Sequence, residues 1–299
     1  MGFTAGGRSR RAQHPAPQCE DIMSKRNLGL IFCMLAGAPA ALADDGTILI
    51  GQPVQFPYVI SQPGSYRLSS NLTVAANAPV GAIEIAASSV TLDMNGFTIS
   101  CAGCSAGAPI GILVTGTDVL IRNGQITGFQ GMQGLGAGVS IQGTNAHPVE
   151  ATMSHVSANN NGFGFYSTPG STMTVMDSAA SDDYIAGVAA QGQGIILRCN
   201  IIRNVYLSTP GAGGIYVKDG VVSDNLLSNV DAGIVVAGNA RVVNNMILGS
   251  DDGIRNQSGQ WAYGFNFFGA IGFDDVTPGL GLSLNNNIGG TGIGPVRVF

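Results

Sequence analysis

One short pattern occurs twice, and begins a third time, in residues 214–254, which read GIYVKDGVVSDNLLSNVDAGIVVAGNARVVNNMILGSDDGI. Each copy opens with a glycine and an apolar-x-apolar triplet and continues with an apolar-x-x-Asn-x-apolar element. Both elements alternate with a period of two, which is typical of short β-strands, and the Gly and Asn residues between them favour tight corners. The pattern therefore predicts a repeat built from short strands.

The glycine triplet recurs upstream through most of the chain. Its glycines are separated by 27, 24, 25, 27, 19 and 20 residues, and Ile83-x-Ile85 is the same element one unit earlier. No stretch of ten or more residues shows helical spacing. A nearly constant period of this size indicates a repeat architecture. The glycines are Gly111, Gly138, Gly162, Gly187, Gly214, Gly233 and Gly253.

Units with two or three short strands and no helix predict an all-β fold, a single-stranded right-handed parallel β-helix. At this period the solenoid has about nine to ten coils with terminal caps. Each strand then pairs with its counterpart one coil away, about 4.8 Å along the axis. Asparagine at a recurring corner, as at Asn95, Asn200, Asn225 and Asn245, can form a ladder of side chains. Leucine-rich, hexapeptide and sandwich folds each require a pattern that this chain lacks.

The composition agrees with such a fold. The 299 residues include 45 glycines, only 10% are charged, and the mean hydropathy is +0.26. The chain is too apolar for disorder and too poor in Leu, Glu and Lys for a helical protein. Many glycines and asparagines indicate many corners that need positive φ.

The sequence divides into five segments. We expect residues 1–22 to be an over-extended start or a disordered leader. Residues 23–43 have the pattern of a signal peptide, with a basic Ser24-Lys25-Arg26, an apolar run and a cleavage signature ending at Ala43. Residues 44–80 form an N-terminal cap and first coil, residues 81–260 the coils, and residues 261–299 an aromatic C-terminal cap and tail. We expect cleavage near Ala43 and a secreted or periplasmic protein.

The net charge of the mature chain restricts the range of partners that it can bind. From Asp44 onward there are eight Lys and Arg against sixteen Asp and Glu, a net charge of −8. Nucleic acid is an unsuitable partner because phosphate binding needs clustered cations. The mature chain has no apolar run long enough to span a membrane. The sequence leaves the oligomeric state open.

Two stretches near the N-terminus resemble a known family. They are ISQPGSYRLSSNLTV, residues 60–74, and IEIAASSVTLDMNGFTIS, residues 83–100. Both look like the opening of bacterial exported right-handed β-helix repeat proteins of the pectate-lyase-like and periplasmic carbohydrate-binding and sugar-hydrolase superfamily. The resemblance covers most of the mature chain and implies the fold. It implies little about activity, because that superfamily includes lyases, hydrolases, epimerases and adhesins.

Paired aspartates are the candidate catalytic residues. Asp231 and Asp251 each lie two residues before a repeat glycine, and Asp252 follows. They should stack one coil apart, about 5 Å, near the carboxylate separation of retaining glycosidases. They can equally hold Ca²⁺, which prefers several oxygen ligands, or simply form solvated corners, where Asp is a favoured residue. We expect no other metal and no other cofactor.

The known catalytic patterns of the superfamily are incomplete here. GSDDGI, residues 249–254, matches only the diacid element of polygalacturonase-like enzymes, and neither Gly-His-Gly nor Arg-x-Lys occurs. The outward face of the first strand is not charged: it carries Glu84, Leu113, Ser140, Gly164, Ala189, Tyr216 and Val235. Two histidines, His147 and His155, remain after cleavage, too few for a His-based metal site.

Candidate ligand-binding residues are Tyr216, Trp261 and Arg255. Trp261 can stack on a sugar, or it can belong to the C-terminal cap. The arginines Arg198, Arg203, Arg241 and Arg255 can bind acidic sugars or neutralise aspartates at the corners.

The mature chain keeps three cysteines. Cys101 and Cys104 form a C-x-x-C in a loop after a strand, for which we expect a small local disulfide, with free thiols as the alternative. Cys199 should be buried as a small apolar side chain.

Two functional classes follow. The first, which the incomplete catalytic patterns favour, is an exported solenoid that binds a polysaccharide, a cell-surface glycan or a surface partner along one face of its coils. The second is a polysaccharide lyase, glycoside hydrolase or epimerase that uses Asp231, Asp251 and Asp252.

Overall fold

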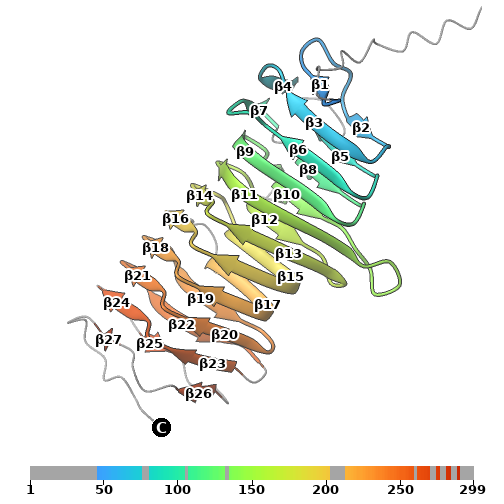
Figure 1. The fold of residues 1–299 in the computed structure, drawn as a ribbon. Coiled ribbons are helices and arrows are strands. Elements are labelled where there is room, and N and C mark those ends of the chain that lie inside the picture. Colours follow the sequence, from blue (N-terminus) through green and yellow to red (C-terminus); the bar gives the residue numbers. More distant parts are fainter. Residues whose placement is uncertain are drawn as a thin grey trace, which may run out of the picture. The chain divides into compact units, whose positions relative to one another are not determined.

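The described part of the chain consists of parallel β-strands and contains no helix. In this computed structural model each strand pairs with the equivalent strands one turn before and one turn after it, which makes a solenoid (Figure 1). All described residues belong to one compact unit, residues 40–299, and the predicted leader and signal peptide lie outside them. The described residues are 46–75, 81–104, 107–131, 135–202, 213–258, 261–269, 274–276, 281–283 and 288–289.

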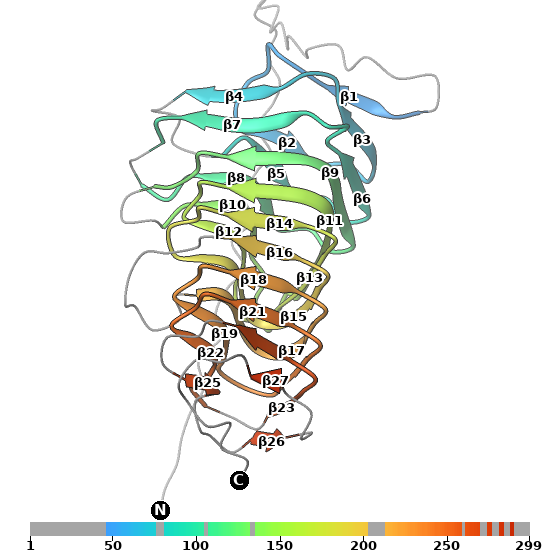
Figure 2. The ribbon, with the colours of Figure 1, turned by 90° about the vertical axis from the view of Figure 1, so that its left-hand side faces the viewer.

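The strands form three columns, which Figure 2 shows from the side. The first column is β2 (Tyr58–Ile60), β5 (Ile83–Ile85), β8 (Ile110–Val114), β10 (Ala137–Ile141), β12 (Phe163–Ser167), the starts of β15 (Ala186–Leu197) and β17 (Gly213–Ser223), β19 (Ala232–Val236), β22 (Asp252–Asn256) and β25 (Asp274–Val276). The second is β1 (Ile48–Ile50), β3 (Gly64–Leu68), β6 (Val90–Asp93), the starts of β9 (Val119–Thr127) and β11 (Val149–Asn159), β13 (Ser171–Met176), the ends of β15 and β17, β20 (Ala240–Val243), β23 (Trp261–Gly264) and β26 (Gly281–Ser283). The third is β4 (Leu72–Ala75), β7 (Thr98–Ala102), the ends of β9 and β11, β14 (Ala179–Ser181), β16 (Asn200–Ile202), β18 (Leu226–Ser228), β21 (Met246–Leu248), β24 (Phe267–Gly269) and β27 (Ile288–Gly289).

The predicted parallel solenoid is confirmed. About eight regular turns run from β5–β7 to β22–β24, slightly fewer than the nine to ten predicted, and a terminal turn flanks them at each end, β2–β4 and β25–β27. The boundary predicted at residue 261 falls inside a turn, because β22 and β23 belong to the same turn and β23 pairs with β20. The aromatic segment that begins at Trp261 therefore continues the coils.

Apolar side chains, most of them aliphatic, stack inside the solenoid, each above its counterpart on the preceding turn. In the first column every member of one such stack is fully buried, and removal of this apolar surface from water stabilises the fold. The members are Ile83, Ile112, Val139, Phe165, Val188, Ile215, Ile234 and Ile254.

The repeat glycines form a column of their own at the start of the first-column strands. A Cβ on Gly111 would lie 2.5 Å from the carbonyl oxygen of Gly138, and one on Gly138 would lie 2.8 Å from that of Gly164. Only glycine fits because each turn places its backbone directly against the next. The assignment of this position to Gly162 was wrong: the pairing of Phe165 with Val139 places Gly164 there and Tyr166 on the outward face.

The corner between the second and third columns, here the 2–3 corner, has the same backbone on seven consecutive turns. One residue per turn adopts a left-handed conformation, with φ between 48° and 60°. Asn, Asp and His tolerate this conformation better than other non-glycine residues, and they supply five of the seven. The residues are Asn123, His155, Asp177, Arg198, Asp224, Asn244 and Phe265.

The next residue at the 2–3 corner points inward, and on the last turns it builds the predicted asparagine ladder. Asn225 Oδ1 accepts a hydrogen bond from the backbone N–H of Cys199 (2.8 Å), Asn245 Oδ1 from that of Asn225 (3.1 Å) and Asn266 Oδ1 from that of Asn245 (3.0 Å). All three asparagines are at most 2% exposed. Asn95 and Asn200, assigned to this ladder from the sequence, are exposed, and Cys199 takes the inward place beside Asn200.

Candidate functional site

The predicted aspartates do come together. Asp231 and Asp251 lie on consecutive turns, and the backbone N–H groups of Asp251 and Asp252 both donate to the carbonyl oxygen of Asp231, at 2.9 and 3.3 Å. Asp251 is exposed, whereas Asp231 and Asp252 are partly buried. The three residues form an acidic cluster at the corner between the third and first columns, here the 3–1 corner.

Arg255 completes this acidic cluster. Its Nε donates to Asp252 Oδ2 at 2.7 Å and its terminal nitrogen binds the same oxygen. Arg255 is thus held by an aspartate of its own strand, which leaves Asp231 and Asp251 as the acids that face each other. Burial raises the pKa of Asp231, the charge of Arg255 opposes the rise, and the neighbouring carboxylate of Asp251 adds to it.

A carboxyl group with a raised pKa can donate a proton, so the acidic cluster has the elements of a general acid. Among the residues that the structure describes, no three His, Cys, Asp or Glu side chains are arranged to hold a metal ion. Two turns earlier at the same corner, Asp183 is 1% exposed and accepts hydrogen bonds from the backbone N–H and the Nδ2 of Asn161, at 2.9 and 3.2 Å. Asp183 therefore belongs to the interior of the corner and does not extend the acidic cluster.

We expect Asp231→Asn to raise the free energy of unfolding at pH 7, by no more than about 1 kcal/mol because the carboxyl group remains largely in water. Because its pKa is raised, the carboxyl group of Asp231 ionises less readily in the folded state than in the unfolded state. The contribution of Asp231 to the free energy of unfolding is therefore fully present below the unfolded pKa and is lost as the pH rises through the folded pKa. The increase in the free energy of unfolding caused by Asp231→Asn should therefore disappear on acidification. Denaturant titrations between pH 3 and pH 7 measure it, with the exposed Glu150→Gln as control; an equal gain at all pH values would contradict the assignment.

The other predicted ligand-binding residues lie apart from one another. Trp261 is 4% exposed and its ring stacks on that of Tyr263, with centroids 4.3 Å apart, so it packs as a core residue and presents no open stacking platform. Tyr216 lies on the outward face of the first column between Ala189 and Val235, which are 3% and 0% exposed. Burial raises the pKa of Tyr216, and this face offers little open surface around it.

Two of the three cysteines of the predicted mature chain form a disulfide, and the third, Cys199, lies on the inward side of the 2–3 corner next to Arg198. Cys101 and Cys104 are joined by a disulfide with Cα atoms 5.7 Å apart, at the end of β7. Cys199 is 2% exposed, and burial raises the pKa of its thiol to about 11, so it stays protonated and unreactive at neutral pH.

A groove opens at the 2–3 corner, on a part of the surface that the sequence analysis did not single out. It has a volume of about 400 Å³ and is open to solvent. Its lining comes from four turns: Gly124, His155, Val156, Ser157, Asp177, Ser178, Ala179, Arg198 and Asn200. The hollow exists because the outward residues Ser157 and Ala179 of the third column are small, whereas the longer side chains of the 2–3 corner extend into the solvent beside them.

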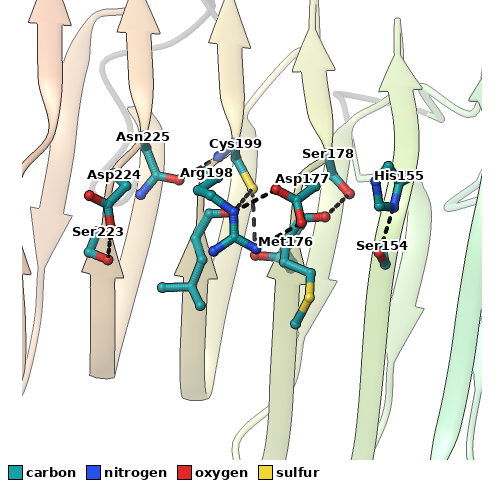
Figure 3. A network of polar contacts seen from close by, with 12 residues as sticks. Ser154, His155, Met176, Asp177, Ser178, Arg198, Cys199, Ser223, Asp224 and Asn225 are labelled. Atoms are coloured by element: carbon teal, nitrogen blue, oxygen red, sulfur yellow. Dashed lines mark hydrogen bonds and ion pairs between the residues drawn. The ribbon is translucent and has the colours of Figure 1, made fainter.

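Charged and polar side chains line up along this groove, one turn apart (Figure 3). Arg198 binds Asp177 with two hydrogen bonds, Nε to Oδ1 at 2.6 Å and a terminal nitrogen to Oδ2 at 2.8 Å. On the turn before Asp177, His155 Nδ1 lies 2.8 Å from Oγ of the preceding residue, Ser154. On the turn after Arg198, Asp224 accepts a hydrogen bond from Ser223 Oγ at 2.6 Å. The corner thus presents the order His155, Asp177, Arg198, Asp224.

The Arg198–Asp177 pair is exposed to water and mutually neutralising. The hydrogen bonds from Arg198 lower the pKa of Asp177, with smaller contributions from the charges of Arg198 and His155, and Asp177 in turn raises the pKa of Arg198. The side chains remain 53% and 32% exposed, so they can exchange bonds with a ligand. The signal in the sequence was a polar residue just before each inward corner residue, spaced by a full turn.

Comparison with known proteins places the chain in a family. The family described as right handed beta helix region matches residues 81–260. The chain belongs to this family of right-handed β-helix proteins. No curated protein and no solved structure matches the chain. Among the described residues, none forms a helix that is long and apolar enough to cross a membrane.

Proposed function

We propose that this β-helix protein is exported, after cleavage near Ala43, and binds a glycan in the groove at the 2–3 corner without cleaving it. The observation that carries the proposal is the groove itself, an open hollow with a floor of small side chains and a wall of hydrogen-bonding groups. Such a site matches a ligand that is rich in hydroxyl groups, because each hydroxyl both donates and accepts. Open grooves on a rigid solenoid also suit long chains that extend beyond the site.

The residues in the groove have distinct parts in this proposal. Asn200 and His155 supply amide and imidazole groups that donate to or accept from hydroxyls, and Ser157 adds a hydroxyl at the floor. The Asp177–Arg198 pair holds the wall in place and offers acceptor and donor atoms side by side. Ala179 leaves the space that a sugar ring would fill.

Calorimetric titration with a panel of neutral and uronic-acid oligosaccharides tests the proposal. The wild-type chain should bind at least one neutral oligosaccharide, and Ala179→Phe should abolish that binding because the new ring fills the hollow without removing a charge. Ala102→Phe, at an exposed outward position of the same column, is the matched control and should bind as the wild type does. Binding that survives Ala179→Phe would rule out the groove.

The second candidate function is cleavage of a polysaccharide by Asp231, Asp251 and Asp252. The raised pKa of Asp231 beside Asp251 favours it, since a hydrolase needs one protonated and one ionised carboxyl group. In this alternative, the hydrogen bond from Arg255 would hold the third aspartate, Asp252, in place. Under this alternative the protein releases shorter products, and Asp251→Asn abolishes their release.

A further inference from the structure

The outward side chains of the third column change character along the solenoid. The register is continuous from strand to strand, and the first five outward residues are polar or small: Thr98, Gln125, Ser157, Ala179 and Asn200. The next three are apolar: Leu226, Met246 and Phe267. The groove therefore leads directly, through Asn200, onto an apolar ladder.

These apolar side chains are exposed to water. Leu226 is 38% exposed, Met246 43% and Phe267 38%, and Phe265 at the adjoining corner is 53% exposed. Together, here called the apolar stripe, they are four of the six large hydrophobic side chains that are exposed in the described residues. A contiguous apolar patch of this kind on a solvent-exposed face indicates a binding surface.

Phe265 is the unusual member of the apolar stripe. It has φ of 57° at the corner position where the preceding turns carry Asn, His, Asp or Arg. A bulky aromatic residue is a rare occupant of the left-handed region, and strain of this kind is retained mainly at functional positions. With 53% of its surface exposed, the Phe265 side chain lies on the outside of the corner that leads into β24.

We propose that the apolar stripe is a stacking subsite for the same glycan, so that the ligand runs along the third column from the groove onto the stripe. This inference rests on the proposed function. A sugar ring has hydroxyl groups at its edge and C–H groups on its faces, so one chain can use both surfaces. A protein partner fits less well, because a specific interface uses about 20–30 residues a side.

The charges at the groove identify the ligand as a neutral glycan. Arg198 is the arginine in the described lining, and its Nε and one terminal nitrogen are both bonded to the Asp177 carboxylate. Asp224 on the next turn adds a further negative charge close to Arg198. A uronic acid would meet no uncompensated positive charge there, and like charges disfavour its approach.

The experiment compares oligosaccharides of two lengths with the double variant Phe265→Asn/Phe267→Thr. Both replacements suit their positions, Asn the left-handed corner and Thr a strand, so the variant should fold. We expect a long neutral oligosaccharide to lose about tenfold in affinity and a short one that fills only the groove to lose none. The control Val59→Thr/Leu135→Thr removes two exposed apolar side chains elsewhere and should change neither affinity.

The outcomes separate the inference from the proposed function. Unchanged affinity of the double variant for the long oligosaccharide would overturn the stacking subsite, as would a change in its oligomeric state by light scattering without a change in affinity. Equal affinities for uronic-acid and neutral oligosaccharides would overturn the inference that the ligand is a neutral glycan. Binding of uronic-acid chains alone would also overturn that inference and leave the proposed function standing. If the wild-type chain binds no oligosaccharide of either kind, or if Ala179→Phe still binds, the proposed function fails as well.

Discussion

Asn245→Ala is expected to lower the free energy of unfolding by about 3 kcal/mol, because it breaks the asparagine ladder at its centre. Asn245 Oδ1 accepts from the backbone N–H of Asn225 at 3.1 Å and from Asn225 Nδ2 at 2.9 Å. Its Nδ2 donates to the carbonyl oxygens of Val222 and Val243, at 3.1 and 3.0 Å. Alanine leaves all four groups without this partner in a region that excludes water, and it opens a small cavity.

Urea titration followed by circular dichroism measures the effect. Asn200→Ala is the matched control, because Asn200 is an exposed asparagine at the start of β16, and its loss should change the free energy of unfolding by less than about 0.5 kcal/mol. Equal effects of the two substitutions would show that the buried ladder does not stabilise the solenoid.

Gly233→Ala is expected to cost about 3 kcal/mol, near the upper end of the cost of overpacking. The added Cβ would meet the carbonyl oxygen of Gly253 on the next turn and lie 2.7 Å from Ile247 Cγ2 in the core. The carbonyl belongs to a backbone that is paired with β19 through the parallel ladder, so it cannot withdraw without breaking strand hydrogen bonds.

Gly269→Ala is the control for this prediction. Among the described residues, a Cβ on Gly269 would meet the ends of two side chains, Leu248 at 2.8 Å and Phe267 at 3.4 Å, which can rotate away. The same denaturant titration should therefore find little change for Gly269→Ala and a large loss for Gly233→Ala. A small effect at Gly233 would mean that the glycine column is not required for the close approach of successive turns.

The fold was predictable because its requirements repeat in the sequence. On most turns a glycine stands at the start of the first-column strand, where a Cβ would meet the backbone of the next turn, and an apolar residue follows it. The pattern could therefore be read without a structure. Its error at Gly162 arose because Phe163 and Phe165 suit a strand in either register, and only the pairing with Val139 distinguishes them. Repeats fix the fold class better than the phase of any one turn.

The asparagine ladder was predictable only in part. Asn225 and Asn245 were assigned correctly, but Asn95 and Asn200 were not, because Asn serves equally well in an exposed corner and in a buried one. In the turn of β15 and β16, Cys199 points inward and the ladder begins one turn later, at Asn225. Whether an asparagine at this corner is buried or exposed depends on a shift of one residue in the chain, and the repeat pattern alone does not show that shift.

The acidic cluster was predictable from spacing, and the groove was not. Asp231 and Asp251 precede repeat glycines by the same interval, so their proximity follows from the period of the solenoid. The groove depends on the absence of bulk at Ser157 and Ala179 and on the outward corner residues His155, Asp177 and Arg198. Small side chains carry no chemical signature, and the corner residues resemble ordinary turn residues in the sequence.

Glycan binding without cleavage is tested most directly by measuring binding and turnover of the same neutral oligosaccharide with three proteins, the wild type, Ala179→Phe and Asp251→Asn. Calorimetry reports the binding, and mass spectrometry of the incubated mixtures reports any product. We expect saturable binding without products in the wild type, loss of binding in Ala179→Phe, and unchanged binding in Asp251→Asn. Release of shorter products by the wild type, abolished by Asp251→Asn and retained by Ala179→Phe, would contradict this expectation.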